Sequence, residues 1–214
     1  MNNDVEVRNR ILLKANDMFQ RFGFSKVTME EIASGLGISK RTLYKHFSNK
    51  EHLLKEIISS IKCEVDDFIE GLLSDKSMEF IEKLKRFMNF IAKQGSRLEG
   101  PIVKDLMRSH PEFWRDIEEF RKKKAYTNLS RLIEQGTKSG IFRKDVNTEV
   151  VVLAYVASIH SLINPEVLAR LPISADEVFK DIVKILFEGI FTTEGRKKYN
   201  TSTLIKDNYG ESVI

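Results

Sequence analysis

Six polar side chains of different chemistry lie close together near the N-terminus: Lys40, Arg41, Thr42, Tyr44, Lys45 and His46. If this segment forms a helix that turns them outward, the helix exposes three cations, a hydroxyl group, a phenol and an imidazole. Such a helix suits the major groove of DNA, because Arg and Lys bind guanine O6 and N7 while hydroxyl groups and Tyr bind phosphates. A solvated helical hairpin is the alternative interpretation of the same residues.

Two helices joined by a tight turn are needed to present this segment, and the preceding residues have the required pattern. Thr28 and Glu31 are spaced as a capping box, which predicts that a helix starts at Thr28. Ala33 is small where two helices must approach closely, and Gly37 can adopt the positive φ that the turn requires. Ser39 can cap the helix that carries the six polar side chains.

The helix-turn-helix expected over residues 29–48 lies between two further predicted helices. The first covers residues 5–22, where apolar residues repeat at helical spacing and Gly23 follows as a stop signal. Ser48 and Glu51 have the spacing of another capping box, which predicts the start of a fourth helix. The first sixty residues therefore indicate a small helical domain.

The rest of the chain also predicts helices. Residues 80–92 and 113–133 form amphipathic stripes. Residues 146–163 and 178–191 are apolar over a wider arc, and helices of that kind must be covered on more than one side. The second cover is either the remainder of the core or another copy of the chain, and the residues alone leave both open.

Length and composition are those of a helical globular protein. The 214 residues are 42% hydrophobic and 31% charged, with only 4 Pro and 11 Gly. No segment approaches about 18 uncharged apolar residues, the length of a membrane-spanning helix, and the N-terminus lacks the apolar run of a signal peptide. We therefore expect a soluble, cytoplasmic protein without a membrane partner.

Positive charge is concentrated in the first third of the chain. Residues 1–62 contain 11 Lys and Arg against 7 Asp and Glu, which accounts for the whole net charge of +4. Residues 38–50 contain no acidic residue. Charge of this kind is typical of nucleic-acid binding, although a basic patch is also common on solvated surfaces.

Residues for metal or catalytic chemistry are scarce. The single cysteine, Cys63, excludes an internal disulfide and a zinc site built on several thiolates, and we expect it to be a small buried apolar residue. The four histidines lack metal-ligand spacing, and Cys63 is in no recognisable nucleophile motif. We expect no metal, no cofactor and no enzymatic activity.

Residues 8–58 resemble the DNA-binding region of the TetR family of regulators. The family signature G-[IV]-S-x-x-T-L-Y-x-H-F-x-x-K-E-x-L stands here as Gly37, Ile38, Ser39, Thr42, Leu43, Tyr44, His46, Phe47, Lys50, Glu51 and Leu53. The remainder of the chain is similar to the family only in being helical.

The resemblance implies an all-α chain of about nine helices. It places a three-helix DNA-binding domain at residues 1–50 and a larger helical domain for effector binding and dimerisation at residues 51–193. The dimer would form through the last two long helices, at about residues 147–164 and 175–192, which favours the second-copy interpretation of the apolar helices. Residues 194–214 have no sustained period and are expected to be a flexible tail.

The resemblance also assigns residues to roles. Phosphate contacts are expected from Thr28, Thr42, Tyr44, His46 and Lys50, with Ser39 beside them. Base contacts are expected from Lys40, Arg41 and Lys45. The expected dimer interface comprises Val152, Tyr155, Val156, Ile159, Val183, Leu186, Phe187 and Ile190. Adaptable aromatic and Met side chains suit an apolar ligand, and the expected effector site comprises Phe87, Met88, Met107, Phe113 and Trp114.

The sequence thus predicts a DNA-binding regulator. The leading hypothesis is a repressor that binds a palindromic double-stranded operator as a homodimer and is released by a small apolar or amphipathic effector. An activator, or a regulator without a small-molecule effector, is the second hypothesis. A helical interaction protein whose motif no longer binds DNA is the third.

Overall fold

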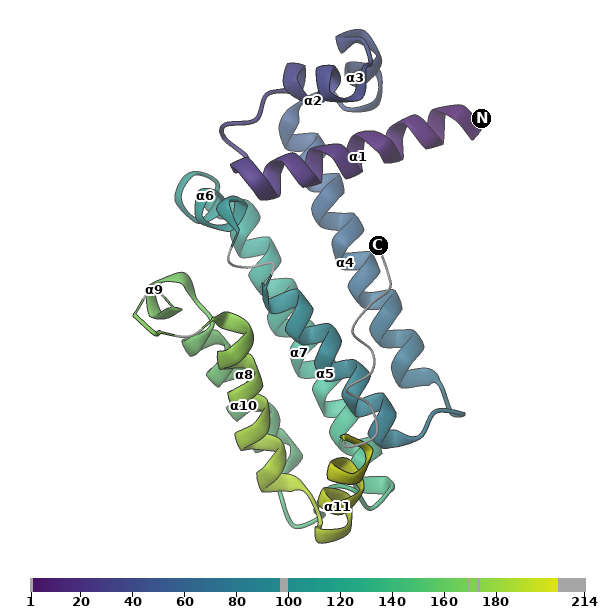
Figure 1. Ribbon diagram of the computed structural model, residues 1–214, viewed down its shortest axis with the longest axis vertical. Helices are drawn as coiled ribbons and strands as arrows, with labels where there is room; N and C mark the ends of the chain where they lie inside the picture. Colours follow the sequence, from purple (N-terminus) through teal and green to yellow (C-terminus); the bar gives the residue numbers. More distant parts are fainter. Residues whose placement is uncertain (1, 97–99, 169, 173, 204–214) are drawn as a thin grey trace. The chain divides into compact units, whose positions relative to one another are not determined.

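The computed structural model describes residues 2–96, 100–168, 170–172 and 174–203, most of which are helical (Figure 1). The helices are α1 (Asn2–Phe22), α2 (Met29–Leu36), α3 (Lys40–His46), α4 (Lys50–Ser74), α5 (Phe80–Ser96), α6 (Pro101–Ser109), α7 (Pro111–Lys138), α8 (Thr148–Leu162), α9 (Pro165–Leu168), α10 (Ala175–Ile190) and α11 (Thr193–Thr203). An isolated bridge between Phe142 and Phe191 is the only β-type pairing within the described residues. The predicted all-α fold is confirmed.

The chain folds as two compact units. Of the described residues, unit 1 comprises those in 2–68 and 100–121, and unit 2 comprises those in 69–96 and 122–203. The divisions after residues 68 and 121 fall inside helices, so α4 and α7 contribute residues to each unit, whereas the division after residue 96 coincides with the end of α5. The boundaries predicted at residues 50 and 193 divide the chain by function, into a DNA-binding part, an effector-binding and dimerisation part, and a tail. The compact units do not test this division, so it stays a prediction.

One hydrophobic core joins the helices of unit 1. Ile11 and Phe19 of α1 and Leu43 of α3 are fully buried in it, and α6 adds Val103 and Leu106. α1 packs against both α2 and α6 (Figure 1). Burying each large apolar side chain stabilises the unit by about 1.5 to 3 kcal/mol, so the position of α3 is set mainly by this core.

The local signals of the helix-turn-helix act as predicted. Thr28 and Glu31 form the capping box that starts α2, with the Glu31 amide donating to the Thr28 hydroxyl at 3.2 Å. Gly37 ends α2 with φ of 66°, in the left-handed region that favours glycine. Ser39 then caps α3 by accepting a hydrogen bond from the Thr42 amide at 3.0 Å.

Two helix starts differ from the sequence prediction. α4 begins at Lys50, and Asn49 rather than Ser48 provides the cap, because its Oδ1 accepts a 2.7 Å hydrogen bond from the His52 amide. Asn and Ser are almost equally good N-caps, so adjacent candidates compete. α7 begins at Pro111, two residues before the predicted stripe of residues 113–133, and this position suits the fixed φ and missing N–H of proline.

Unit 2 is organised around α10. This helix packs against α5 and α8, and α11 packs against α5 (Figure 1). The buried Phe142 ring lies 5.4 to 5.6 Å from the rings of Phe80, Phe187 and Phe191. Edge-to-face and tilted aromatic groups of this kind stabilise a core beyond the apolar area that they bury.

Three of the described helices were not predicted from the sequence: α6, the four-residue α9 and α11. α6 begins at Pro101 without a side-chain cap from Gly100. α11 occupies residues 193–203 of the expected tail, and the Thr192 hydroxyl accepts a 2.9 Å hydrogen bond from the Gly195 amide at its start. Residues 204–214 of that tail lie outside the described residues.

Candidate DNA interface

α3 has one buried face and one exposed face. Leu43 is fully buried, whereas Lys40, Arg41, Tyr44 and Lys45 are exposed. Among the described residues, Arg41 and Tyr44 have no hydrogen-bond or ion-pair partner for the guanidinium or the phenol. Both groups are therefore available to an external ligand without first breaking a contact inside the chain.

The hydroxyl groups predicted to contact phosphates already form capping hydrogen bonds. Thr28 donates its hydroxyl hydrogen to the Glu31 carboxylate at 2.9 Å. Hydrogen bonds from the Thr28 amide and hydroxyl lower the pKa of Glu31, because they stabilise its ionised carboxylate. The hydroxyl oxygens of Ser39 and Thr42 lie 2.8 Å apart. Because a phosphate only accepts hydrogen bonds, Thr28 must turn its hydroxyl hydrogen away from Glu31 before it can contact DNA.

Lys50 contacts the chain itself rather than solvent. Its half-buried ammonium group donates hydrogen bonds of 2.9 Å to the carbonyl oxygens of Phe24 and Val27, and it lies 3.4 Å from that of Ser25. It also lies 4.4 Å from the centroid of the Phe24 ring, in a cation–π arrangement. The structure therefore places Lys50 as a support of the loop between α1 and α2, where the sequence predicted a phosphate contact.

Two carboxylates from outside residues 38–50 contact cationic side chains of α3. Asp4 Oδ1 lies 2.8 Å from Lys45 Nζ and 3.6 Å from Nε2 of His46, whose side chain is only 6% exposed. Glu30 Oε1 lies 3.0 Å from Lys40 Nζ. The hydrogen bond from Lys45 lowers the pKa of Asp4, and the hydrogen bond from Lys40 lowers the pKa of Glu30.

Neither pair was predicted from the sequence. Residues 38–50 contain no acid, but Asp4 lies 41 residues away from Lys45 along the chain. Only the folded arrangement of α1, α2 and α3 brings these groups together.

α6 supports the loop that precedes the helix-turn-helix. The Asp105 carboxylate accepts hydrogen bonds from the Ser25 amide at 2.5 Å and the Ser25 hydroxyl at 2.7 Å. Partial burial raises the pKa of Asp105, but the hydrogen bonds from Ser25 outweigh it and the net pKa lies below the ordinary value. The adjacent Gly23 has φ of 86° and faces Asp105 so closely that a Cβ would lie 3.2 Å from its Oδ2. This contact links α6 directly to the connection between α1 and α2.

The residues predicted to form an effector site are divided between the units. Phe87 and Met88 belong to unit 2, where Phe87 is buried. Met107, Phe113 and Trp114 belong to unit 1 and pack in or against its core.

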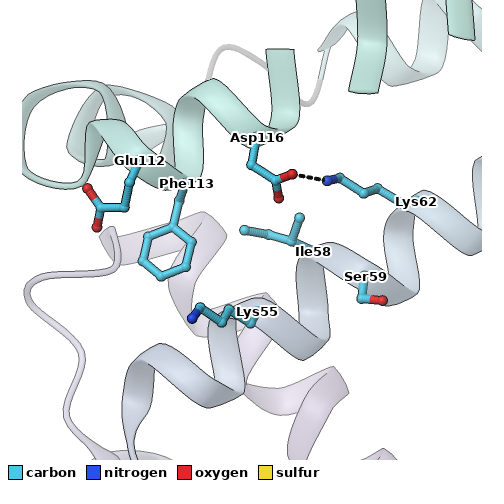
Figure 2. Close-up of a pocket in the computed structure, with 7 residues that line it drawn as sticks. All are labelled: Lys55, Ile58, Ser59, Lys62, Glu112, Phe113 and Asp116. Atoms are coloured by element: carbon cyan, nitrogen blue, oxygen red, sulfur yellow. Dashed lines mark hydrogen bonds and ion pairs between the residues drawn. The ribbon is translucent and has the colours of Figure 1, made fainter. Parts of the chain in front are cut away.

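Phe113 also lines a pocket in unit 1 with a cavity volume of about 480 Å³ (Figure 2). The other lining residues are Lys55, Ile58, Ser59, Lys62, Glu112 and Asp116. Figure 2 shows the Phe113 ring between charged groups of both signs, with Lys62 Nζ 2.7 Å from Asp116 Oδ1. The lining is therefore amphipathic, and Phe113 is the only one of these seven residues that was predicted from the sequence.

Most residues predicted for a dimer interface are buried within the single chain. Five of the eight are buried: Val152, Tyr155, Val183, Phe187 and Ile190. Val156, Ile159 and Leu186 are half-buried. Large apolar side chains of the same two helices are exposed at Val150 (61%), Leu153 (52%), Leu162 (39%) and Ile185 (72%). A partner chain would meet these four residues rather than the five buried ones.

Other chemistry is limited in the part of the chain that the structure describes. No group of three or more His, Cys, Asp or Glu there is placed to hold a metal ion. No helix there is long and apolar enough to cross a lipid bilayer. Cys63 is exposed, so the prediction that it is buried was wrong.

Comparison with known proteins agrees with this geometry. Residues 11–57 match the family model for bacterial regulatory proteins of the tetR family. The chain is 28% identical to the HTH-type transcriptional regulator YvaF of Bacillus subtilis, over 86% of this chain and 96% of YvaF. It is 26% identical to the HTH-type transcriptional repressor KstR2 of Mycolicibacterium smegmatis, over 89% of this chain and 93% of KstR2.

The fold is also similar to that of CprB from Streptomyces coelicolor, a TetR family protein solved in complex with its operator sequence. The TM-score is 0.61 at 21% identity, and the match covers 94% of this chain and 96% of CprB.

Proposed function

We propose that this chain is a transcriptional regulator of the TetR family, and that it is a repressor that binds a palindromic operator as a homodimer. A small apolar or amphipathic effector releases it from the DNA. The repressor name of KstR2 supports the direction of regulation. An activator, or a regulator without a small effector, is the alternative.

The exposed face of α3 carries this proposal. Arg41 is free to form two hydrogen bonds to guanine O6 and N7. Tyr44 is 45% exposed and can donate its phenol hydrogen to a phosphate. Lys40 and Lys45 extend the cationic surface on either side, and Thr42 adds a hydroxyl group at the first turn.

Selection of duplexes from a random library tests the proposal. A homodimer that binds through two copies of α3 should select sequences with two-fold symmetry, whose half-sites lie about 34 to 36 Å apart or a multiple of one DNA turn. Failure to select any duplex would support the hypothesis of an interaction protein that no longer binds DNA.

Arg41→Ala then identifies the base-contacting side chain. Because Arg41 is proposed to contact particular bases, the variant should lose about 1 to 3 kcal/mol on the selected operator and little on a random duplex. Arg86→Ala is the control, since Arg86 is an exposed arginine of unit 2 that pairs with Glu82. Equal losses on both duplexes would remove Arg41 from the base-contacting residues.

The homodimer is proposed to form through the exposed faces of α8 and α10. Val150, Leu153 and Ala157 follow each other at spacings of three and four residues and are exposed on α8. Ile185 of α10 is the most exposed large apolar residue of the chain's described part, at 72%. Burial of these side chains against a second copy would remove apolar surface from water.

The effector is proposed to bind the amphipathic pocket of unit 1. Its volume falls within the range of small-molecule sites. Phe113 and Ile58 can contact an apolar chain, while Lys55 and Lys62 can attract an anionic head group (Figure 2). The pocket lies on α4 and α7, and α4 follows α3 directly in the chain.

A further inference from the structure

The Asp4 carboxylate places a negative charge at the proposed DNA-binding surface. It lies in the first turn of α1, and its carboxylate is 2.8 Å from Lys45 Nζ and 3.6 Å from His46 Nε2, both on α3. The side chains of Asp4 and Lys45 are 60% and 66% exposed, so solvent and DNA can reach both. A second pair, Glu30 with Lys40, has the same arrangement at the other end of α3.

A carboxylate of the same chain reduces the binding free energy that a lysine gains from a phosphate. A free lysine that binds DNA releases counterions, and this release drives much of the affinity. Lys45 must first exchange Asp4 for the phosphate, after which the Asp4 carboxylate remains beside the negatively charged backbone. The exchange of partners and the repulsion between Asp4 and the DNA backbone each weaken DNA binding.

We propose that Asp4 acts as an intramolecular counter-anion that lowers the affinity of α3 for DNA and reduces its dependence on salt. The inference rests on the proposed function, because it requires Lys45 to contact DNA.

A purely structural tie between α1 and α3 makes the opposite prediction. If Asp4 mainly held α3 in place, its loss would weaken DNA binding. α3 is already fixed by Leu43 and Phe47, which are fully buried in the core of unit 1. Exposed ion pairs contribute little to stability, so the pair between Asp4 and Lys45 is not needed for that purpose.

Asp4→Asn in the full-length protein tests the proposal. The variant should bind the selected operator and a random duplex about two- to fivefold more tightly at low salt, as expected for removing one exposed ion pair. The slope of log affinity against log salt should steepen by up to about one. Asp17→Asn is the matched control, because Asp17 is also on α1 and pairs with an arginine of the same helix, Arg21.

The outcomes separate the inference from the proposed function. Unchanged or weaker binding by Asp4→Asn, or an equal change in Asp17→Asn, would overturn the role of Asp4. Lys45→Gln should weaken binding, and Asp4→Asn should tighten binding less in the Lys45→Gln background than in the wild type, because only the repulsion between Asp4 and the DNA backbone is then removed. If Lys45→Gln binds like the wild type, Lys45 does not contact DNA and the inference falls with that premise. If Lys45→Gln weakens binding but Asp4→Asn does not tighten it, only the inference fails.

Discussion

A lysine beside a DNA-binding helix can bind a phosphate or the carbonyl oxygens of its own chain, and residue type does not decide between them. Lys45 is exposed on α3, whereas Lys50 donates to the loop between α1 and α2 and covers the Phe24 ring. That loop ends at Thr28, the cap of α2. Lys50 therefore connects the start of α4 to the position of the helix-turn-helix.

Lys50→Met should mainly reduce stability. It keeps the aliphatic stem but leaves the carbonyl oxygens of Phe24 and Val27 without their donor, which costs about 1 to 3 kcal/mol when the groups are partly buried. The free energy of unfolding, measured by urea denaturation, checks the value. Lys55→Met is the control, since Lys55 is exposed on the same helix.

A different result would support the phosphate contact that the sequence predicts for Lys50. If Lys50→Met unfolds like the wild type but binds all duplexes more weakly, Lys50 contacts phosphates after all.

At the scale of elements, the sequence predicted the helices that carry strong local signals. Capping at Thr28, positive φ at Gly37 and capping at Ser39 depend on a few neighbouring residues, so the helix-turn-helix and the exposed face of α3 could be derived. α6 has nine residues and no side-chain cap, and α11 has too few apolar residues to show a period. Their positions depend on packing that no local pattern encodes.

The partners of the predicted site residues could not be derived in the same way. Asp105 is 80 residues from Ser25, and Asp4 is 41 residues from Lys45. Such contacts follow from the packing of α1 against α2 and α6, not from spacing along the chain.

The buried and exposed sides of α8 could not be predicted from its sequence either. Residues 148–162 are apolar almost all round, so their pattern does not tell which side packs inside the chain. Tyr155 is buried, while Val150 and Leu153 are exposed. The choice of Val152 and Tyr155 as interface residues therefore selected the inner face.

Leu153→Asp combined with Ile185→Asp should separate the proposed dimer. Both side chains are more than half exposed in the single chain, so the charges cost little in the monomer but would be buried twice in a symmetric interface. Sedimentation velocity should show a monomer with unchanged helical circular dichroism. Leu13→Asp is the control, because Leu13 is 71% exposed on α1. A double variant that still sediments as a dimer would place the interface elsewhere.

At the scale of the whole molecule, regulation requires two sites that influence each other. The proposed operator contacts lie on α3 and the proposed effector pocket lies on α4 and α7 of the same unit. An effector can release DNA only if it binds the DNA-incompatible state more tightly than the DNA-bound state. A 100-fold loss of operator affinity requires a coupling free energy of about 2.7 kcal/mol.

Dodecanoate is a suitable probe for this coupling, because its chain can contact Phe113 and its carboxylate can approach Lys55. Trp114 is the only tryptophan of the chain and adjoins Phe113, so its fluorescence should report binding. Since coupling between two binding sites is reciprocal, saturating operator should weaken dodecanoate binding by the same factor by which dodecanoate weakens operator binding. Phe80→Leu controls for general loosening, because Phe80 is half-buried against the Phe142 ring in unit 2, whereas Phe113→Leu should reduce dodecanoate affinity. Equal dodecanoate affinity with and without operator would show that occupation of this pocket does not release the DNA, and the effector would then have to act from another site.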